Sequence, residues 1–428
     1  MLPQPPAEIA ALLARPVAIF GAGVSGQGVS LLLGAFGARG CVYDEKAEGS
    51  VKSFSAEQAA THGLVVFSPG FAPEHAWLVT ARAAGCRCLG ELDFASLFWR
   101  GEVVAITGTN GKTTLTEFFA HALTSAGRRA HVTGNVGFPF SRLVVEQSLH
   151  AAETTAVCEV SSFQAETLQH LRPTATLWTN FAEDHLERHP GMDAYFAAKW
   201  RLIARTPPGA VFVGSSVQSY ANTTTQHTRD PLPVSARIAT AGQPADDRLR
   251  GTVFADYPQR ENFLLAAAWW RHARLPEETL FAAAHSFQLG QHRFARVGEK
   301  RGVTFWNDSK ATNFHAVEAA LATFPSPVLW IGGGKAKGGD LAAFVRRIAA
   351  KVRHAFLIGE TQPALAAFCR DSGVPATPCD SLDQAVRSAF AQAGAGEHIL
   401  LSPGFASFDM FRGYDDRGRQ FERSVEKL

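Results

Sequence analysis

Apolar and polar positions along the chain follow one recurring pattern. A short apolar or β-branched run is followed by a glycine-containing turn and then by a helical stretch. The pattern occurs in three blocks, whose clearest strands are Val17-Ala-Ile-Phe20, Val103-Val-Ala-Ile106 and Val303-Thr-Phe-Trp306. Such alternation is typical of helices packed on mostly parallel sheets, so we predict an α/β protein.

Each block predicts several elements. The first has strands 17–20 and 41–43 around a helical segment at 29–33. The second has strands 103–106, 156–160, 175–178 and 210–213, with helices 113–125 and 192–203. The third has strands 303–306, 328–331, 355–358 and 398–401, with helices that begin near 314, 341 and 363. The polar stretch 215–256, interrupted by Pro and Gly, predicts only surface loops and short strands.

Composition narrows the function classes. At about 150 residues per domain, 428 residues predict two to four domains. A net charge of +2 gives no reason to expect nucleic acid or a membrane surface as a partner. The N-terminal residues lack a basic segment followed by an apolar run, so no signal peptide is predicted. The six cysteines form no CxxC pair and are expected to be thiols in the cytoplasm.

Two glycine loops follow predicted strands. Gly21-Ala-Gly-Val-Ser-Gly26 fits GxGxxG, and Asp44 lies 23 residues after Gly21, near the spacing of the ribose-binding acid in dinucleotide folds. Taken alone, this loop suggests a nicotinamide-dependent oxidoreductase. The motif is weak, because glycines at these positions can also serve only close packing of strand and helix.

The second loop is more informative. Gly108-Thr109-Asn110-Gly111-Lys112-Thr113-Thr114 joins a strand to a helix, so its backbone N–H groups can point at phosphate oxygens. Lys112 is expected at the β- and γ-phosphates and Thr113 at Mg²⁺. It is not a complete Walker A motif, because Ile106 replaces the first glycine. Phosphate sites on two domains favour an ATP-dependent enzyme that acts on a nucleotide-linked substrate.

The loop at 106–114 resembles the ATP loop of the Mur ligases, the amide-bond-forming enzymes of peptidoglycan assembly. Further motifs follow in that family's order: Gly134-Asn-Val-Gly137, Glu159-Val-Ser-Ser-Phe-Gln164, Asn180-Phe-Ala-Glu-Asp-His185, Ala198-Lys199, His292-Arg-Phe294, Asn307-Asp-Ser-Lys-Ala-Thr-Asn313 and Leu401-Ser-Pro-Gly-Phe-Ala-Ser-Phe-Asp409. Together they span nearly the whole chain, and they most resemble the branch that adds glutamate to UDP-N-acetylmuramoyl-L-alanine.

The resemblance implies an architecture and a reaction. Residues 1–100 are expected to form a Rossmann-like domain for the UDP substrate. Residues 101–292 are expected to form a P-loop-type ATPase domain with a mostly parallel sheet, and residues 293–428 a Rossmann-like domain for the amino acid. ATP would convert the substrate carboxylate to an acyl-phosphate, which the amine of glutamate attacks, with release of ADP and phosphate. D-glutamate is expected, although the sequence leaves the chirality open.

The resemblance also assigns site residues. The implied catalytic residues are Lys112, Glu159, His185 and Lys199, and the implied ligands of two Mg²⁺ ions are Thr113, Glu159, His185 and, if carbamylated, Lys199. The other implied ATP contacts, besides Gly108–Thr114, are Asn262, Arg293, Asp308 and Lys310. The implied UDP-substrate contacts are Val24, Ser25, Asp44, Gly70, Asn135 and His185. The implied amino-acid contacts are Thr312, Lys337, Ser407, Phe408 and Tyr414.

Some residues depart from the family pattern. Glu261-Asn262-Phe-Leu-Leu265 keeps only one residue of the usual His-Asn-x-x-Asn, and Glu45-Lys46 replaces a small-then-basic pair, so adenine and uracil contacts differ in detail. His185 in an acidic turn, and Lys199 on a helix, could also be ordinary solvated side chains.

Other functions stay open at this point. They are a different Mur branch or a folylpolyglutamate-type ligase, a nicotinamide-dependent oxidoreductase, and a nucleotide-binding regulator without activity. For the ligase we expect a cytoplasmic monomer that binds small-molecule substrates.

Overall fold

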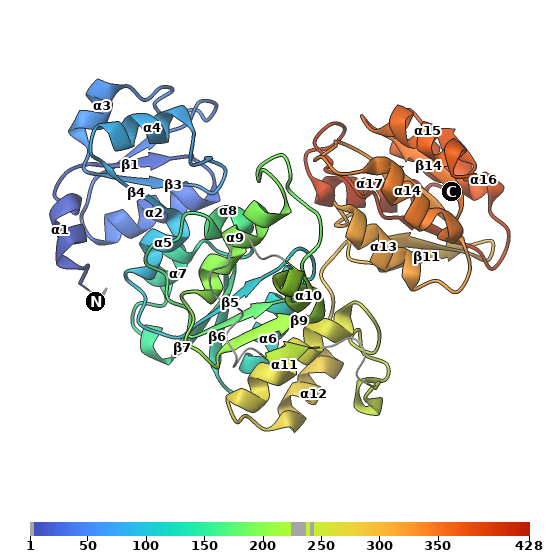
Figure 1. Ribbon diagram of the computed structural model, residues 1–428, viewed down its shortest axis with the longest axis horizontal. Helices are drawn as coiled ribbons and strands as arrows, with labels where there is room; N and C mark the ends of the chain where they lie inside the picture. Colours follow the sequence, from blue (N-terminus) through green and yellow to red (C-terminus); the bar gives the residue numbers. More distant parts are fainter. Residues whose placement is uncertain (1–3, 224–236, 240–243) are drawn as a thin grey trace. The chain divides into compact units, whose positions relative to one another are not determined.

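The computed structural model describes residues 4–223, 237–239 and 244–428. In this part of the chain there are three β-sheets, one of four strands and two of six. Contacts divide the chain into two compact units, Met1–Phe181 with Asp193–Phe287, and Ala182–Met192 with Gln288–Leu428 (Figure 1). The first unit holds the first two sheets and the second unit holds the third. No helix of the described residues is long and apolar enough to cross a membrane.

The first sheet is parallel throughout, in the order β2-β1-β3-β4. Its central strands, β1 and β3, are buried at every position, as expected for parallel strands covered on both faces. The strands are β1 (Val17–Phe20), β2 (Gly40–Tyr43), β3 (Leu64–Phe67) and β4 (Arg87–Gly90). The helices are α1 (Ala7–Leu13), α2 (Val24–Ala35), α3 (Ala56–Thr61), α4 (Ala76–Ala83) and α5 (Glu91–Ser96).

The second sheet is also parallel, in the order β10-β9-β8-β5-β7-β6. Its strands are β5 (Val103–Thr107), β6 (Arg129–Gly134), β7 (Thr154–Glu159), β8 (Ala175–Trp178), β9 (Val211–Gly214) and β10 (Arg237–Ala239). The helices are α6 (Lys112–Ser125), α7 (Phe140–Glu146), α8 (Ser162–Ala165), α9 (Met192–Ile203), α10 (Ser215–Thr223), α11 (Gln259–His272) and α12 (Glu277–Ser286). Because β5 lies between β7 and β8, the turns that follow these three strands meet at one edge.

The third sheet has the order β11-β12-β16-β13-β14-β15, and only β11 runs antiparallel. Its strands are β11 (Ala295–Lys300), β12 (Val303–Asn307), β13 (Val328–Gly333), β14 (Val352–Ile358), β15 (Ala376–Pro378) and β16 (His398–Leu401). The helices are α13 (Phe314–Ala322), α14 (Leu341–Ile348), α15 (Gln362–Asp371), α16 (Leu382–Gln392) and α17 (Tyr414–Glu426). The predicted α/β class with largely parallel sheets is therefore confirmed.

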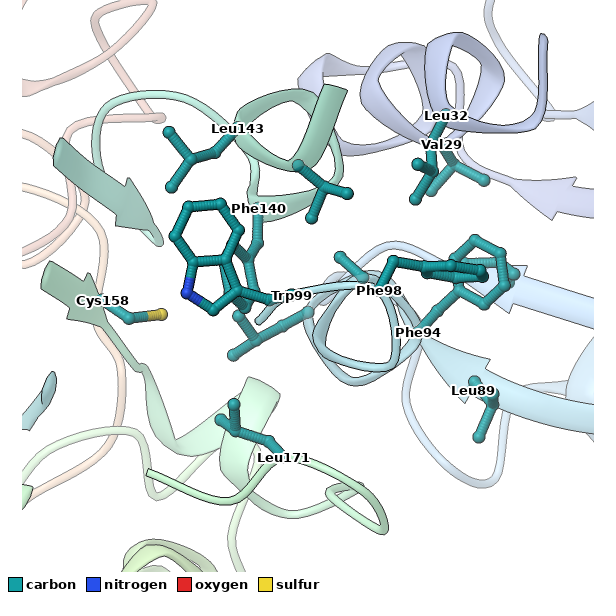
Figure 2. Packing of buried hydrophobic residues seen from close by; sticks show 14 of the residues in the cluster. Val29, Leu32, Leu89, Phe94, Phe98, Trp99, Phe140, Leu143, Cys158 and Leu171 are labelled. Atoms are coloured by element: carbon teal, nitrogen blue, oxygen red, sulfur yellow. The ribbon is translucent and has the colours of Figure 1, made fainter. Parts of the chain in front are cut away.

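The first two sheets share one hydrophobic core. Figure 2 shows Val29 and Leu32 from α2, Phe98 and Trp99 after α5, and Phe140 from α7 turned toward a common interior. The rings of Trp99 and Phe140 lie 5.6 Å apart, centroid to centroid. Burial of this much apolar surface fixes the first sheet relative to the second.

Two buried carboxylates on α5 reinforce this junction. Asp93 accepts backbone hydrogen bonds from Gln169, at 3.0 Å, and from His170 and Leu171, both at 2.8 Å. Glu91 accepts from the backbone N–H and the hydroxyl of Ser141, at 2.7 and 2.6 Å, and burial raises the pKa of this carboxyl group. Since α5 directly follows β4, these bonds attach the first sheet to segments that precede and follow β7 of the second sheet.

Replacing Asp93 with alanine is expected to weaken this junction. The substitution leaves three N–H groups without their acceptor and should lower the free energy of unfolding by about 3 kcal/mol. Urea denaturation followed by tryptophan fluorescence measures this change. Asp93→Asn is the matched control, because its single amide oxygen still accepts two of the three bonds and the loss should be smaller. Equal stability of Asp93→Ala and the unmodified chain would contradict the role of Asp93.

Candidate active site

The loop after β5 has a backbone that only glycine adopts easily. Gly108 has φ +150°, and a Cβ atom there would lie 1.8 Å from the Thr179 hydroxyl oxygen. Gly111, with φ +79°, is the N-cap of α6, so the N–H groups of the first helical turn face the loop and have no partner within the helix. The predicted phosphate loop therefore lies at a helix N-terminus, the usual place for an anion.

Side chains from the segment that follows β8, and from α11, hold this loop. The backbone N–H of Asn110 donates to Asn180 Oδ1 at 2.9 Å, and the Thr179 hydroxyl donates to the Asn110 carbonyl at 2.6 Å. Asn262 is buried on α11, where its amide donates weakly to the Gly111 carbonyl at 3.4 Å. The loop is thus fixed from two directions before any ligand binds.

Two lysine ammonium groups meet at one backbone carbonyl of the loop. Lys112 Nζ donates to the Gly108 oxygen at 2.9 Å and to the Thr109 oxygen at 2.8 Å. Lys199 Nζ, from α9, also donates to the Gly108 oxygen at 2.9 Å. The Lys199 side chain is only 1% exposed and contacts the hydroxyl of Thr107 at 3.3 Å. Lys199 is therefore not a solvated surface lysine, and positive charge is concentrated beside the loop.

A buried carboxylate lies at the end of the neighbouring strand. Glu159 ends β7, is 2% exposed, and accepts a hydrogen bond from Asn135 Nδ2 at 2.8 Å through Oε1. Its other oxygen, Oε2, is buried and has no hydrogen-bond partner among the residues that the structure describes. An unpartnered buried carboxylate oxygen costs free energy unless a cation or donor binds there. Glu159 and Asn135, predicted separately, are thus brought together.

The predicted UDP residues Val24, Ser25, Asp44 and Gly70 follow β1, β2 and β3 at the carboxyl edge of the first sheet. Asp44 accepts from the backbone N–H groups of Ala22, Lys46 and Ala47, each at 2.9 Å. These bonds, the one from Ala22 above all, lower the pKa of Asp44 to about 2. Asp44 therefore holds the Gly21 loop against β2.

In the second unit, Arg293 lies between two residues with left-handed backbones. His292 has φ +62° and Phe294 has φ +52°, conformations that are uncommon for side chains of this size. Both are fastened to the turn after β12, since Lys310 N–H donates to the His292 carbonyl at 3.1 Å and Phe294 N–H donates to Asp308 Oδ1 at 3.1 Å. The predicted ATP residues Arg293, Asp308 and Lys310 are therefore brought together.

Only some of the residues that are predicted to bind the amino acid lie close together. Lys337 Nζ lies 3.5 Å from the Thr312 hydroxyl, and both side chains line one small cavity. Tyr414 instead packs its ring under Lys310 Nζ, 3.7 Å from the ring centroid. Ser407 is buried and Phe408 is 73% exposed, and neither lines that cavity.

His185 belongs to the segment Ala182–Met192, which makes its contacts within the second unit. His185 Nδ1 lies 3.2 Å from Glu187 Oε1, and Nε2 lies 3.6 Å from Asp184 Oδ2. No group of three or more His, Cys, Asp or Glu side chains that could hold a metal ion is found in the described part of the chain. A metal here would depend on ligands from phosphates and water as well.

Several residues that the structure places at these sites were not predicted. They are Thr179 and Asn180, which hold the phosphate loop, Asp184 and Asn313, which line the small cavity, and Arg417. The Arg417 guanidinium is fully buried and donates to the Ser309 and Phe405 carbonyls at 2.9 and 3.2 Å, which ties two loops together. Asn180, Asp184 and Asn313 lie within recognised motifs, but nothing in the sequence around Arg417 signals a buried cation.

Comparisons with known proteins identify the family of this chain. A family model described as Mur ligase middle domain matches residues 106–269, and one described as Mur ligase, glutamate ligase domain matches residues 292–405. The UDP-N-acetylmuramoylalanine–D-glutamate ligase of Gloeobacter violaceus is 34% identical, over 96% of this chain and 99% of that protein. The enzyme of the same name from Frankia casuarinae is 36% identical, over 96% and 93%. The chain belongs to the Mur ligase family.

Solved structures show the same fold. The UDP-N-acetylmuramate-alanine ligase MurC of Thermotoga maritima superposes with a TM-score of 0.59 at 14% identity, over 96% of this chain and 99% of that one. MurF of the same organism, solved in complex with ADP, gives a TM-score of 0.58 at 15% identity, over 85% and 95%. At this identity the likeness concerns the fold alone.

Asp308 predicts a pH dependence of stability. Burial raises the pKa of Asp308 to about 7, above its ordinary value near 3.8. The folded chain therefore binds this proton more tightly than the unfolded chain. Its stabilising contribution is complete below pH about 4 and is lost as the pH rises through about 7.

Comparing the melting temperatures of the unmodified chain and Asp308→Asn at pH 5 and pH 8 tests this assignment. Asparagine has a similar shape and no charge in either state. We therefore expect the variant to gain stability relative to the unmodified chain at pH 8. An identical pH dependence of the two proteins would contradict it.

Proposed function

We propose that this chain is an ATP-dependent ligase that adds D-glutamate to UDP-N-acetylmuramoyl-L-alanine, as the names of its relatives suggest. The main structural support is the convergence of Lys112, Lys199 and Glu159 at the ends of adjacent parallel strands. Two cations and one unpartnered carboxylate oxygen beside a helix N-terminus suit a nucleotide triphosphate with its divalent cation.

We assign the phosphates of ATP to the loop Gly108–Thr114. The N–H groups of the first turn of α6 would cradle them, and Lys112 would leave its carbonyl partners to neutralise charge on the transferring γ-phosphoryl group. The acceptor is the carboxylate of the UDP substrate, which becomes an acyl-phosphate. The amine of glutamate then attacks the acyl carbon, an amide bond forms, and phosphate leaves while ADP is released. Positioning and charge neutralisation carry the catalysis.

The residues present fit Mg²⁺. Glu159 Oε2 offers the hard, buried oxygen ligand that this ion prefers, and Thr113 and His185 are further candidates. When bound, Mg²⁺ supplies positive charge against the phosphate oxygens. We expect two ions, the second held with help from Lys199 in a carbamylated form.

Repulsion between two ammonium groups would favour carbamylation of Lys199. As an ammonium group, Lys199 shares the Gly108 carbonyl with Lys112, so two like charges lie close together in a buried position. Conversion to a carbamate replaces one cation by a carboxylate-like anion. That change removes the repulsion and adds an oxygen ligand beside Glu159's strand.

The remaining substrate contacts are assigned domain by domain. We assign UDP to residues 1–100 through Val24, Ser25, Asp44 and Gly70, with Asn135 and His185 toward the muramoyl part. Residues 101–292 hold ATP with Asn262 near the base. Residues 293–428 contribute Arg293, Asp308 and Lys310 to ATP, and Thr312, Lys337, Ser407, Phe408 and Tyr414 to glutamate. We expect a monomer that works in the cytoplasm, where ATP and UDP-linked precursors are found.

The proposed reaction predicts that ADP release needs both co-substrates. A coupled assay should show turnover only with UDP-N-acetylmuramoyl-L-alanine and D-glutamate together, and L-glutamate should be measured beside it. Lys112→Ala should lower kcat by about 100-fold, because a charge at the transferring group is lost. Absence of turnover with this pair of substrates in the unmodified chain would refute the proposal.

If Lys199 must be carbamylated, arginine at position 199 should not support activity. Lys199→Arg keeps the positive charge but cannot be carbamylated, so it should lose activity about as strongly as Lys199→Ala, by about 100-fold. Added short-chain carboxylic acids should restore part of the activity of Lys199→Ala by supplying the missing anion. Full activity in Lys199→Arg would show that the carbamate is not needed.

A further inference from the structure

The cavity lined by Thr312 and Lys337 is almost filled. Its volume is about 20 Å³, and Asp184, Asn313 and Gly338 are among its other lining residues. Since one water occupies a cavity of about this size, an amino acid does not fit without a rearrangement. The Asp184 side chain, which is only 7% exposed, lies at this cavity beside Lys337.

Two partners of Asp184 are groups that recognise a carboxylate. Its Oδ2 accepts a hydrogen bond from Asn313 Nδ2 at 3.0 Å, and its Oδ1 lies 3.6 Å from Lys337 Nζ. Asn313 is the N-cap of α13, where its Oδ1 accepts from Ala316 N–H at 3.0 Å, so its N–H₂ group is held in place. An ammonium group, a fixed amide and the nearby Thr312 hydroxyl form a ready-made site for a carboxylate.

We propose that Asp184 is an internal competitor for the carboxylate of the incoming amino acid. Asp184 occupies the position at Lys337 and Asn313 that the ligand's carboxylate takes, so the amino acid binds only by displacing it. This inference rests on the proposed function, which places glutamate at Thr312 and Lys337. It makes Asp184 a specificity-determining residue, because only a ligand with a second carboxylate can replace the anion that leaves.

Displacement of Asp184 would also change the contacts of the neighbouring residue, His185. Asp184 Oδ1 accepts a hydrogen bond from the backbone N–H of His185 at 2.9 Å, and Glu187 holds His185 Nδ1 at 3.2 Å. When Asp184 leaves the cavity, the segment Ala182–Met192 is released from Lys337 and Asn313 together with His185. Arrival of the amino acid is thereby coupled to the position of a proposed substrate and metal contact.

A different role for Asp184 makes the opposite prediction. If Asp184 stayed in place to orient Lys337 for the ligand, removing its charge would weaken ligand binding. If Asp184 competes with the ligand, removing its charge strengthens binding. The sign of the change in Kd therefore separates the two roles.

The test uses the full chain, with D-glutamate and glutarate as ligands in isothermal titration calorimetry. Asp184→Asn keeps the shape of the side chain and should bind both about fivefold more tightly, with a lower KM for glutamate and no rise in kcat. Glu187→Gln is the matched control, an acid in the same segment whose side chain pairs with His185 at 3.2 Å and interacts with Lys337 only through longer-range attraction. Its Kd should stay within about twofold of the unmodified chain. Unchanged or weaker binding by Asp184→Asn overturns the proposal.

A second measurement needs no variant. Hydrogen–deuterium exchange of the unmodified chain should become faster in the segment Ala182–Met192 when glutarate saturates the protein. Slower or unchanged exchange there overturns the proposal. The ligase assay reports on the proposed function separately. If the unmodified chain makes no product but the Asp184→Asn variant binds glutarate more tightly, the proposed ligase function is refuted. The proposed displacement of Asp184 is then still supported.

Discussion

The carbonyl oxygen of Gly108 accepts hydrogen bonds from two ammonium groups, and the rest of the first unit's site is arranged around this point. Lys112 comes from the helix that the loop opens, and Lys199 comes from α9. Glycine is required at 108 because the backbone has φ +150° and the Thr179 hydroxyl occupies the space of a Cβ atom. Two cations at these positions attract anions strongly, and both phosphates and the free oxygen of Glu159 can supply the negative charge.

The first sheet reaches this site through a rigid junction. Asp93 and Glu91 accept hydrogen bonds from backbone segments on either side of β7, the strand that ends at Glu159. A UDP substrate bound at the edge of the first sheet would therefore be held at a fixed position relative to Glu159 and Asn135. The residues proposed to bind the amino acid lie in the other unit, where Asp184 contacts Asn313 and Lys337. In the proposed mechanism, the phosphate site of the first unit is preassembled, whereas the carboxylate site of the second unit responds to its ligand.

The sequence predicts many of the strands that are continuous apolar runs, although β3, which is buried at every position, was not predicted. Strands β1, β8 and β16 and helix α9 have the bounds that the pattern indicated. Strand β11 was missed because it is a half-exposed edge strand, and α10 was missed because the stretch 215–256 is polar; residues 224–236 and 240–243 of that stretch lie outside the described residues. Motifs located the candidate site, yet they could not show that Asp44 holds backbone N–H groups or that Asp184 reaches Lys337. Such pairings depend on turn geometry and on contacts between distant segments.

Three of the cations proposed to bind a substrate anion already have a partner within the protein. Lys112 donates to two carbonyls, Lys337 lies beside Asp184, and Lys310 covers the ring of Tyr414. A ligand must exchange these partners for its own oxygens, so part of its binding free energy is spent on the exchange. Carbonyls and rings are weaker partners than a carboxylate, and phosphate should displace them easily. Asp184 would be the stronger competitor, so under the proposed function the discrimination between ligands is strictest at the amino-acid site.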